Sequence, residues 1–220
     1  MWLWVPHFSK RKSSPHIPKE RKNMLKIKVD FKSFFQKGVP NIDDDFFIRL
    51  ITGYQGSGKS YLAVKLAHEE ENDNRIIKTN IKSYHDNKKD IIYFENISDI
   101  LEDTEDNVTY IIDELSKKYT KESKQDLKFY SWLQQSRKHK RHVYLITQEY
   151  IQVPTWLRGI ANMVYNTSKI PILPIYKTTL GVPILTEEYE WGLQELSIIL
   201  YKRTKKISKL YDTFESINTL

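Results

Sequence analysis

From residue 46 to residue 166, short apolar runs alternate with stretches whose apolar residues recur every three or four positions. The short runs, rich in β-branched and aromatic side chains, predict strands, and the periodic stretches predict helices. This alternation indicates an α/β fold in which helices cover both faces of a parallel sheet. The expected strands cover about 46–52, 75–80, 91–94, 107–115, 142–148 and 162–166, and the expected helices about 59–71, 96–103, 126–138 and 153–161.

The pattern changes after residue 167. Three prolines interrupt residues 169–185, and residues 196–214 alternate in the manner of a hairpin or an edge strand. We therefore expect a single domain over 29–220, with its core at about 46–166 and a β extension at about 167–220. The sequence contains no internal repeat, and we expect no second domain.

The net charge of +7 is concentrated in residues 1–28, which carry eight Lys or Arg and one acid, so that the rest of the chain is balanced. Such a segment is typical of a disordered tail, which either binds phosphates by counterion release or is merely solvated. Translation from Met24 instead of Met1 would remove most of it. No apolar run reaches about 18 residues, so we expect no transmembrane segment.

Residues 53–60, GYQGSGKS, match the phosphate-loop pattern G-x-x-x-x-G-K-[ST] between a predicted strand and a predicted helix. Glycines let backbone N–H groups turn toward a phosphate, and the following helix directs its N-terminus at the same anion. Lys59 is expected to reach the β- and γ-phosphates of ATP, and the Ser60 hydroxyl to ligate Mg²⁺. The expected nucleotide-binding residues are Gly53, Tyr54, Gln55, Gly56, Ser57, Gly58, Lys59, Ser60 and Tyr61.

A second magnesium ligand is expected where an apolar strand ends in an acid. Residues 109–114, TYIIDE, supply Asp113 for the metal and its hydration shell. Glu114 is then placed to polarise an attacking water, which favours hydrolysis over phosphoryl transfer to a metabolite.

Residues 136–148, SRKHKRHVYLITQ, join a basic helix end to an apolar strand that stops at Gln148. If this strand lies between the phosphate-loop strand and the strand that ends at Asp113, the Gln148 amide lies near the γ-phosphate and can orient water. Arg137 is the expected arginine finger for a neighbouring subunit, with Lys140, Arg141 and Arg158 as rivals.

These three motifs resemble the FtsK/HerA class of DNA-pumping ATPases, and within it the branch of zonula occludens toxin-like phage assembly proteins and small viral genome-packaging ATPases. KTN at 78–80 and YDTFE at 211–215 are also similar to that branch. The resemblance implies a RecA-like fold with an additional strand and an oligomeric ring, a hexamer by expectation, that uses ATP and Mg²⁺ to move DNA. It assigns magnesium to Asp113, water activation to Glu114, sensing to Gln148 and the finger to Arg137.

The phage assembly proteins of this branch usually carry a membrane segment after the ATPase domain, and its absence here favours a packaging ATPase in the host cytoplasm. It would be peripheral at an assembly site, with capsid or membrane assembly proteins as further partners. A basic stretch near the C-terminus either lines a DNA-facing surface, interleaved with Tyr201 and Tyr211, or is an exposed hairpin; it contains Lys202, Arg203, Lys205, Lys206 and Lys209. Two other readings stay open: a kinase of a small metabolite, and a scaffold whose slow hydrolysis times a conformational change.

Overall fold

The computed structural model describes residues 27–29, 46–70, 75–87, 89–170, 175–186 and 191–211. Most of the basic tail and the YDTFE sequence beyond Tyr211 lie outside the described residues. The short strand β1 (Ile27–Val29) pairs with the strand that comes last along the chain. The sheet therefore includes residues 27 and 28, which had been assigned to the tail.

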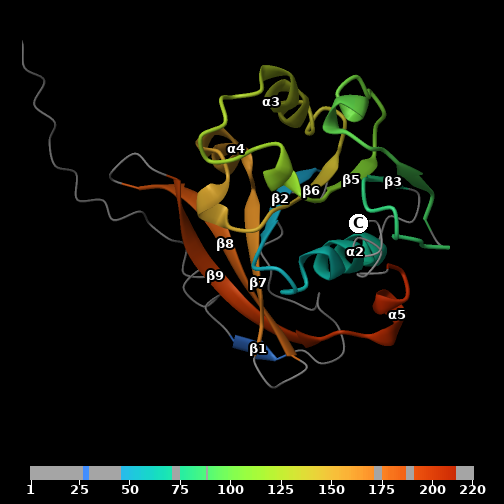
Figure 1. Ribbon diagram of the computed structural model, residues 1–220, viewed down its shortest axis with the longest axis vertical. Helices are drawn as coiled ribbons and strands as arrows, with labels where there is room; N and C mark the ends of the chain where they lie inside the picture. The colour runs from blue at the N-terminus through green and yellow to red at the C-terminus, as the bar shows by residue number, and fades with distance from the viewer. Residues whose placement is uncertain are drawn as a thin grey trace, which may run out of the picture.

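The centre of the fold is a nine-stranded sheet in the order β1-β9-β8-β7-β2-β6-β5-β3-β4 (Figure 1). Every neighbouring pair is parallel except the two pairs that involve β8, so β8 alone among these strands runs in the opposite direction. The other strands are β2 (Phe47–Thr52), β3 (Ile76–Thr79), β4 (Ile91–Tyr93), β5 (Val108–Ile112), β6 (His142–Ile146), β7 (Met163–Lys169), β8 (Ile175–Leu185) and β9 (Trp191–Lys202).

Helices cover both faces of the sheet, as predicted from the alternating pattern (Figure 1). One core lies under α2 (Lys59–Glu69) and α5 (Lys205–Ser208), and the other under α3 (Leu127–Gln134) and α4 (Thr155–Ile160). The five residues of β5 and the five of β6 are all buried, which suits central parallel strands covered on both sides. Short 3₁₀ turns complete the second layer at Ile97–Ile100, Leu115–Lys117 and Tyr150–Gln152.

The C-terminal extension is part of this sheet. Strands β8 and β9 form a long antiparallel hairpin that pairs with β7, and Pro183 lies within β8 opposite Leu193. The alternation over 196–214 had predicted strand or hairpin structure, but after Lys202 the chain turns into α5, where Thr204 caps the helix by accepting from the N–H of Ile207.

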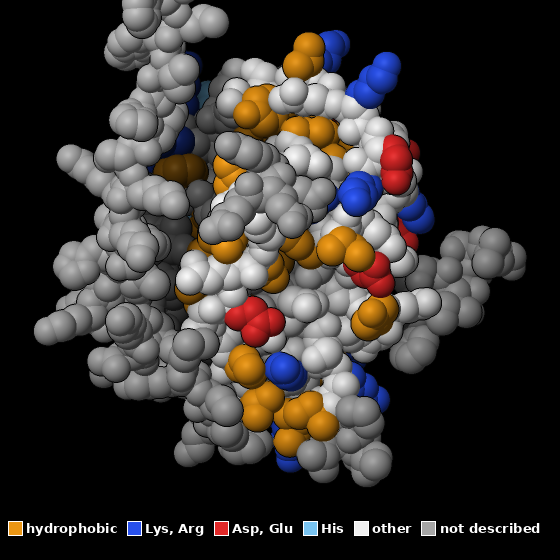
Figure 2. Space-filling model, turned by 90° about the vertical axis from the view of Figure 1, so that its left-hand side faces the viewer, with side chains coloured by type: hydrophobic (Ala, Val, Ile, Leu, Met, Phe, Trp, Pro, Cys, Tyr) orange, Lys and Arg blue, Asp and Glu red, His pale blue; other side chains and the backbone are white. Residues whose placement is uncertain are grey.

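The side of the molecule that carries this hairpin presents apolar side chains over much of its described surface, with isolated charged side chains among them (Figure 2). At the hairpin tip, Ile184 and Leu185 are 39% and 54% exposed. Among the described residues, no helix is both long and apolar enough to span a bilayer.

Candidate nucleotide-binding site

The phosphate loop begins where β2 ends, at the edge of the sheet where the parallel strands have their carboxyl ends. Gly53, Gly56 and Gly58 have φ angles of 145°, 74° and 92°, in the region that glycine adopts without strain. A Cβ at Gly53 would lie 2.3 Å from the carbonyl oxygen of Thr167, and one at Gly58 would lie 3.1 Å from the ring of Tyr176. Close packing thus excludes a side chain at Gly53, whereas at Gly58 the Tyr176 ring would have to shift to admit one.

The side chains of Lys59 and Ser60, at the end of the loop, are preorganised. The Lys59 Nζ donates to the carbonyl oxygens of Gly53 and Tyr54, at 2.8 and 3.0 Å, which folds it back over the loop. The Ser60 hydroxyl donates to Asp113 Oδ2 at 2.8 Å. The predicted pairing of the helix start with the acid after β5 is therefore present, although 53 residues separate the two.

Burial is the largest influence on the pKa values of Asp113 and Lys59. It raises the pKa of the Asp113 carboxyl above its ordinary value, and the hydrogen bond from Ser60 and the charge of Lys59 offset the shift only in part. Burial likewise lowers the pKa of the Lys59 ammonium, against the attraction of Asp113. Both groups thus lack full charge compensation, which a bound phosphate and a cation would provide.

The residues present fit a magnesium ion shared with a nucleotide. The described residues contain no cluster of three or more His, Asp or Glu that could form an all-protein metal cage. Mg²⁺ bound to nucleotides uses one or two protein oxygens, with phosphates and water for the rest, so Ser60 and Asp113 suffice. When bound, the ion would neutralise charge on the β- and γ-phosphates.

Asn80, directly after β3, fixes the backbone of the acid. Its Oδ1 accepts from the Asp113 N–H at 2.7 Å and its Nδ2 donates to the Asp113 carbonyl at 3.0 Å. Asn80 was noted above only within the KTN similarity, and no role was assigned to it. The signal that singled out Gln148, a polar residue that ends a strand, would have found it.

Glu114 lies at the rim of the site. It is exposed, forms an ion pair with Lys117 and has a φ of 56°, a left-handed conformation that costs a non-glycine residue roughly 1–3 kcal/mol. A half-open hollow of about 340 Å³ lies beside it, lined among others by Asn80, Asp113 and Lys117. A strained, solvent-accessible acid at this point has room for a water next to its carboxylate.

Strand β6 lies between β2 and β5, so the condition set for Gln148 is met. The Gln148 carbonyl accepts from the Gly53 N–H at 2.6 Å, and its side chain is exposed. The Gln148 side chain therefore starts next to Gly53, the first residue of the loop. It lies on the same side of β2 as Asp113.

Arg137 is not brought to this site within one chain. It is exposed in the turn after α3, where its guanidinium lies 5.7 Å from the centre of the Phe46 ring. This turn precedes the amino end of β6, whereas Gln148 follows its carboxyl end; the five residues of the strand alone span about 16 Å.

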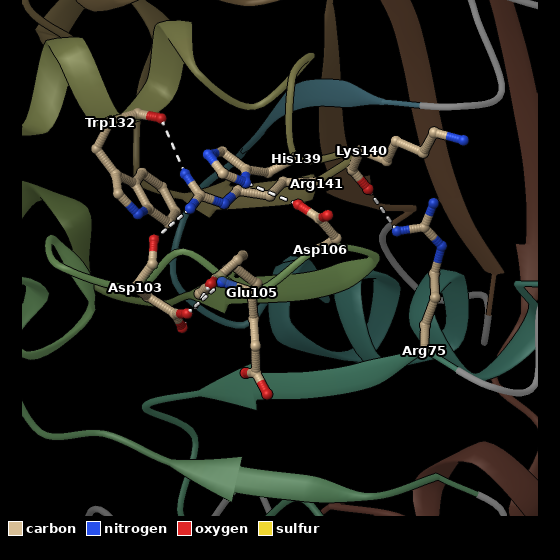
Figure 3. A network of polar contacts seen from close by, with 9 residues as sticks. Arg75, Asp103, Glu105, Asp106, Trp132, His139, Lys140 and Arg141 are labelled. Atoms are coloured by element: carbon tan, nitrogen blue, oxygen red, sulfur yellow. Dashed lines mark hydrogen bonds and ion pairs between the residues drawn. The ribbon is translucent and has the colours of Figure 1, made fainter.

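Both rival arginines, Arg141 and Arg158, are structural. Arg141 is fully buried against Trp132, and its guanidinium donates to the carbonyls of Trp132 and Asp103, in a network that also joins Arg75 to the Lys140 carbonyl (Figure 3). Arg158 is 7% exposed and donates to the carbonyl of Val153 at 2.8 Å. Neither guanidinium is free to reach another subunit.

The basic stretch near the C-terminus divides in two. Lys202, Lys205, Lys206 and Lys209 are exposed. Tyr201 and Tyr211 are buried in the core beneath α2 and α5, so the expected interleaving of exposed tyrosines with these cations is wrong. Arg203 is half-buried beside the phosphate loop.

Thr167, Tyr176 and Arg203 line the loop but were not identified as site residues from the sequence. The Thr167 hydroxyl is 2.8 Å from that of Ser57 and donates to the Thr52 carbonyl at 3.1 Å. All three lie on β7, on β8 or just after β9, and only the strand order places them here. No local signal in the sequence identifies them.

Three features define a P-loop NTPase with a RecA-like sheet. They are the phosphate loop, the hydrogen bond between Ser60 and Asp113, and the strand β6 inserted between β2 and β5. The family described as Zonular occludens toxin (Zot) matches residues 47–215. The chain therefore belongs to the Zot family, in agreement with the resemblance of its motifs.

Comparison with a solved structure of a zonular occludens toxin domain supports the same fold. The N-terminal domain of zonular occludens toxin from Neisseria meningitidis has a TM-score of 0.57 and 18% identity, over 76% of this chain and 98% of that one. The genome packaging NTPase B204 of Sulfolobus turreted icosahedral virus 2, in complex with ATP-gammaS, has a TM-score of 0.48 and 11% identity, over 68% and 97%. None of the curated proteins matches this chain.

Proposed function

We propose that this protein is an ATP-hydrolysing translocase that moves DNA during the packaging of a viral or phage genome or the assembly of its virion. The observation that carries the proposal is the juxtaposition of Ser60 with Asp113, together with the position of β6 between their two strands. The first is suited to hold Mg²⁺ together with a nucleoside triphosphate, and the second supports a role for Gln148, the polar end of β6, beside it.

The proposed chemistry is phosphoryl transfer to water. Lys59 and the loop N–H groups hold the β- and γ-phosphates, while Ser60 and Asp113 hold Mg²⁺. Glu114 acts as the base for the attacking water, and Gln148 orients it. Since the transition state spreads charge over phosphate oxygens, most of the catalysis comes from positioning and charge compensation.

DNA is the proposed substrate of the movement. Membership of the Zot family and the similarity of the motifs to DNA-pumping ATPases support it. Lys205, Lys206 and Lys209 are exposed on and after α5, which contacts α2, the helix that follows the phosphate loop (Figure 1). DNA phosphates bound there would lie against an element that is joined to the nucleotide site.

We further propose a ring, a hexamer by analogy with the FtsK/HerA class. Arg137 is exposed and too far from its own site to act on it, so it can serve as a finger only for a neighbour. The exposed apolar residues of the β8–β9 side are suited to contact between copies (Figure 2).

The test is ATP hydrolysis with and without duplex or single-stranded DNA. We expect hydrolysis that DNA stimulates and that Lys59→Ala abolishes. Changing Lys205, Lys206 and Lys209 together to Gln should weaken DNA binding and reduce the slope of log K against log salt by up to about 3, at ~0.9 for each phosphate contact. The matched control changes the exposed Lys121, Lys124 and Lys128 to Gln. Hydrolysis indifferent to DNA would favour the scaffold, and phosphoryl transfer to a metabolite would favour the kinase.

A mixing experiment tests the ring. A finger supplied by a neighbour contributes about 10³-fold or more to turnover. Inactive Arg137→Ala and inactive Lys59→Ala should therefore regain activity when mixed, because some interfaces pair an intact loop with an intact finger. A fully active Arg137→Ala would remove the finger assignment, since the structure leaves Arg141 and Arg158 no freedom to replace it.

A further inference from the structure

The end of β9 lies at the same edge of the sheet as the phosphate loop. Strand β7 is parallel to β2, and β9 returns to that direction after the antiparallel β8. The first residue after β9, Arg203, therefore emerges where the carboxyl ends of parallel strands form ligand sites. The side of β2 on which it emerges is opposite to that of β6 and β5.

Arg203 is held against the loop by aromatic rings. Its guanidinium carbon lies 4.7 Å from the centre of the Tyr176 ring and 5.2 Å from that of Tyr61. The next residue, Thr204, donates its N–H to the Tyr61 hydroxyl at 2.9 Å, which ties this turn to α2. As a result, Arg203 Nη2 lies 3.6 Å from the position that a Cβ would occupy at Gly58.

The hydrogen-bonding capacity of this guanidinium is not used by the described part of the chain. Its Nε is buried and has no hydrogen-bond partner there, and no described carboxylate forms an ion pair with it. The faces of the tyrosine rings stabilise the cation but accept none of its in-plane N–H groups. A planar fork of donors next to an anion-binding loop fits a phosphate group.

The position of Arg203 beside the loop indicates which phosphate of the nucleotide it would contact. Asp113, Glu114 and Gln148 all lie on the β6 side of β2, so the γ-phosphate belongs there. The other end of the nucleotide must then point toward β7, β8 and β9. We propose that Arg203 is a nucleotide-binding residue that contacts the α-phosphate of the bound nucleotide from the β9 side. This inference rests on the ATPase function proposed above and adds to it a contact supplied by the C-terminal extension.

The experiment is equilibrium binding of ATP and of ADP, measured by calorimetry with the full-length protein under conditions without turnover. Both nucleotides carry the α-phosphate, so Arg203→Gln should weaken both by a similar factor, about ten-fold or more for the loss of a charge-assisted hydrogen bond. Arg203→Lys, which retains the charge but not the fork, should weaken both by a smaller common factor. The matched control is Lys202→Gln, which removes the same charge from the adjacent exposed residue and should bind both as the wild type does.

Each other outcome overturns the inference in a distinct way. A loss confined to ATP would make Arg203 a γ-phosphate contact. Wild-type affinities in folded Arg203→Gln contradict the proposal while leaving the ATPase function intact; if the Gln variant does not fold, wild-type affinities in Arg203→Lys have the same consequence. If the wild-type protein itself binds no ATP, the proposed function fails and this contact fails with it.

Discussion

The two flanks of the phosphate loop present different chemistry to it. On the β6–β5 side are carboxylates and amides, Asp113, Glu114, Gln148 and Asn80, whose positions suit a metal ion and a water. On the β7–β9 side are a hydroxyl, an aromatic ring and a cation, Thr167, Tyr176 and Arg203, which pack against the loop. On the proposed binding mode, the reacting end and the anchored end of the nucleotide would be served by separate halves of one sheet.

The largest expected difference between the flanks is in turnover. Glu114→Gln removes the proposed base, so hydrolysis should fall by about 10²–10⁴-fold while ATP stays bound. Steady-state rates and nucleotide affinity measured on the same preparation check this. Glu102→Gln, which changes an exposed glutamate outside the site, is the control. Near-normal turnover in Glu114→Gln would remove the base from this flank.

A smaller effect is expected on stability. Two glycine substitutions in the loop separate the cost of a positive φ from the cost of packing against Tyr176 on the β9 side. An alanine at Gly56 or Gly58 would have a positive φ, which costs roughly 1–2 kcal/mol of stability. Only at Gly58 does the added Cβ also meet the Tyr176 ring, whereas nothing lies within 4 Å at Gly56. Urea unfolding should therefore find Gly58→Ala the less stable variant. Equal losses would mean that the ring does not press on the loop.

The smallest expected effect concerns the half-buried Asp113. Because burial raises the pKa of Asp113, its charged form destabilises the fold at neutral pH, and the neutral Asp113→Asn should raise the free energy of unfolding without nucleotide by about 1 kcal/mol. Below the pKa of the unfolded chain, about 3.9, both side chains are neutral, so this difference should vanish as the pH falls. Thermal unfolding at pH 7 and pH 3 measures it. A less stable Asp113→Asn at pH 7 would mean that the acid is already compensated in the empty site.

The positions of the candidate residues on one flank follow from the sequence pattern, whereas those on the other flank do not. Asp113 and Gln148 end apolar strands of the alternating core, and such strands deliver their carboxyl ends to one edge of a parallel sheet. Arg203 is different: its place depends on β8 reversing direction and on β9 returning parallel to β2. The hydrogen bond that ties the next residue, Thr204, to Tyr61 in the helix after the loop joins residues 143 positions apart. Within a run of lysines it reads as one more surface cation.

A crystal structure with Mg²⁺ and a non-hydrolysable ATP analogue tests the division between the flanks most directly. We predict Mg²⁺ at about 2.0–2.1 Å from Ser60 Oγ with Asp113 in or next to its coordination shell, the γ-phosphate on the β6 side near Gln148, and the α-phosphate on the β9 side. A nucleotide bound in the reverse direction, with its γ-phosphate toward β7 and β9, would contradict the account.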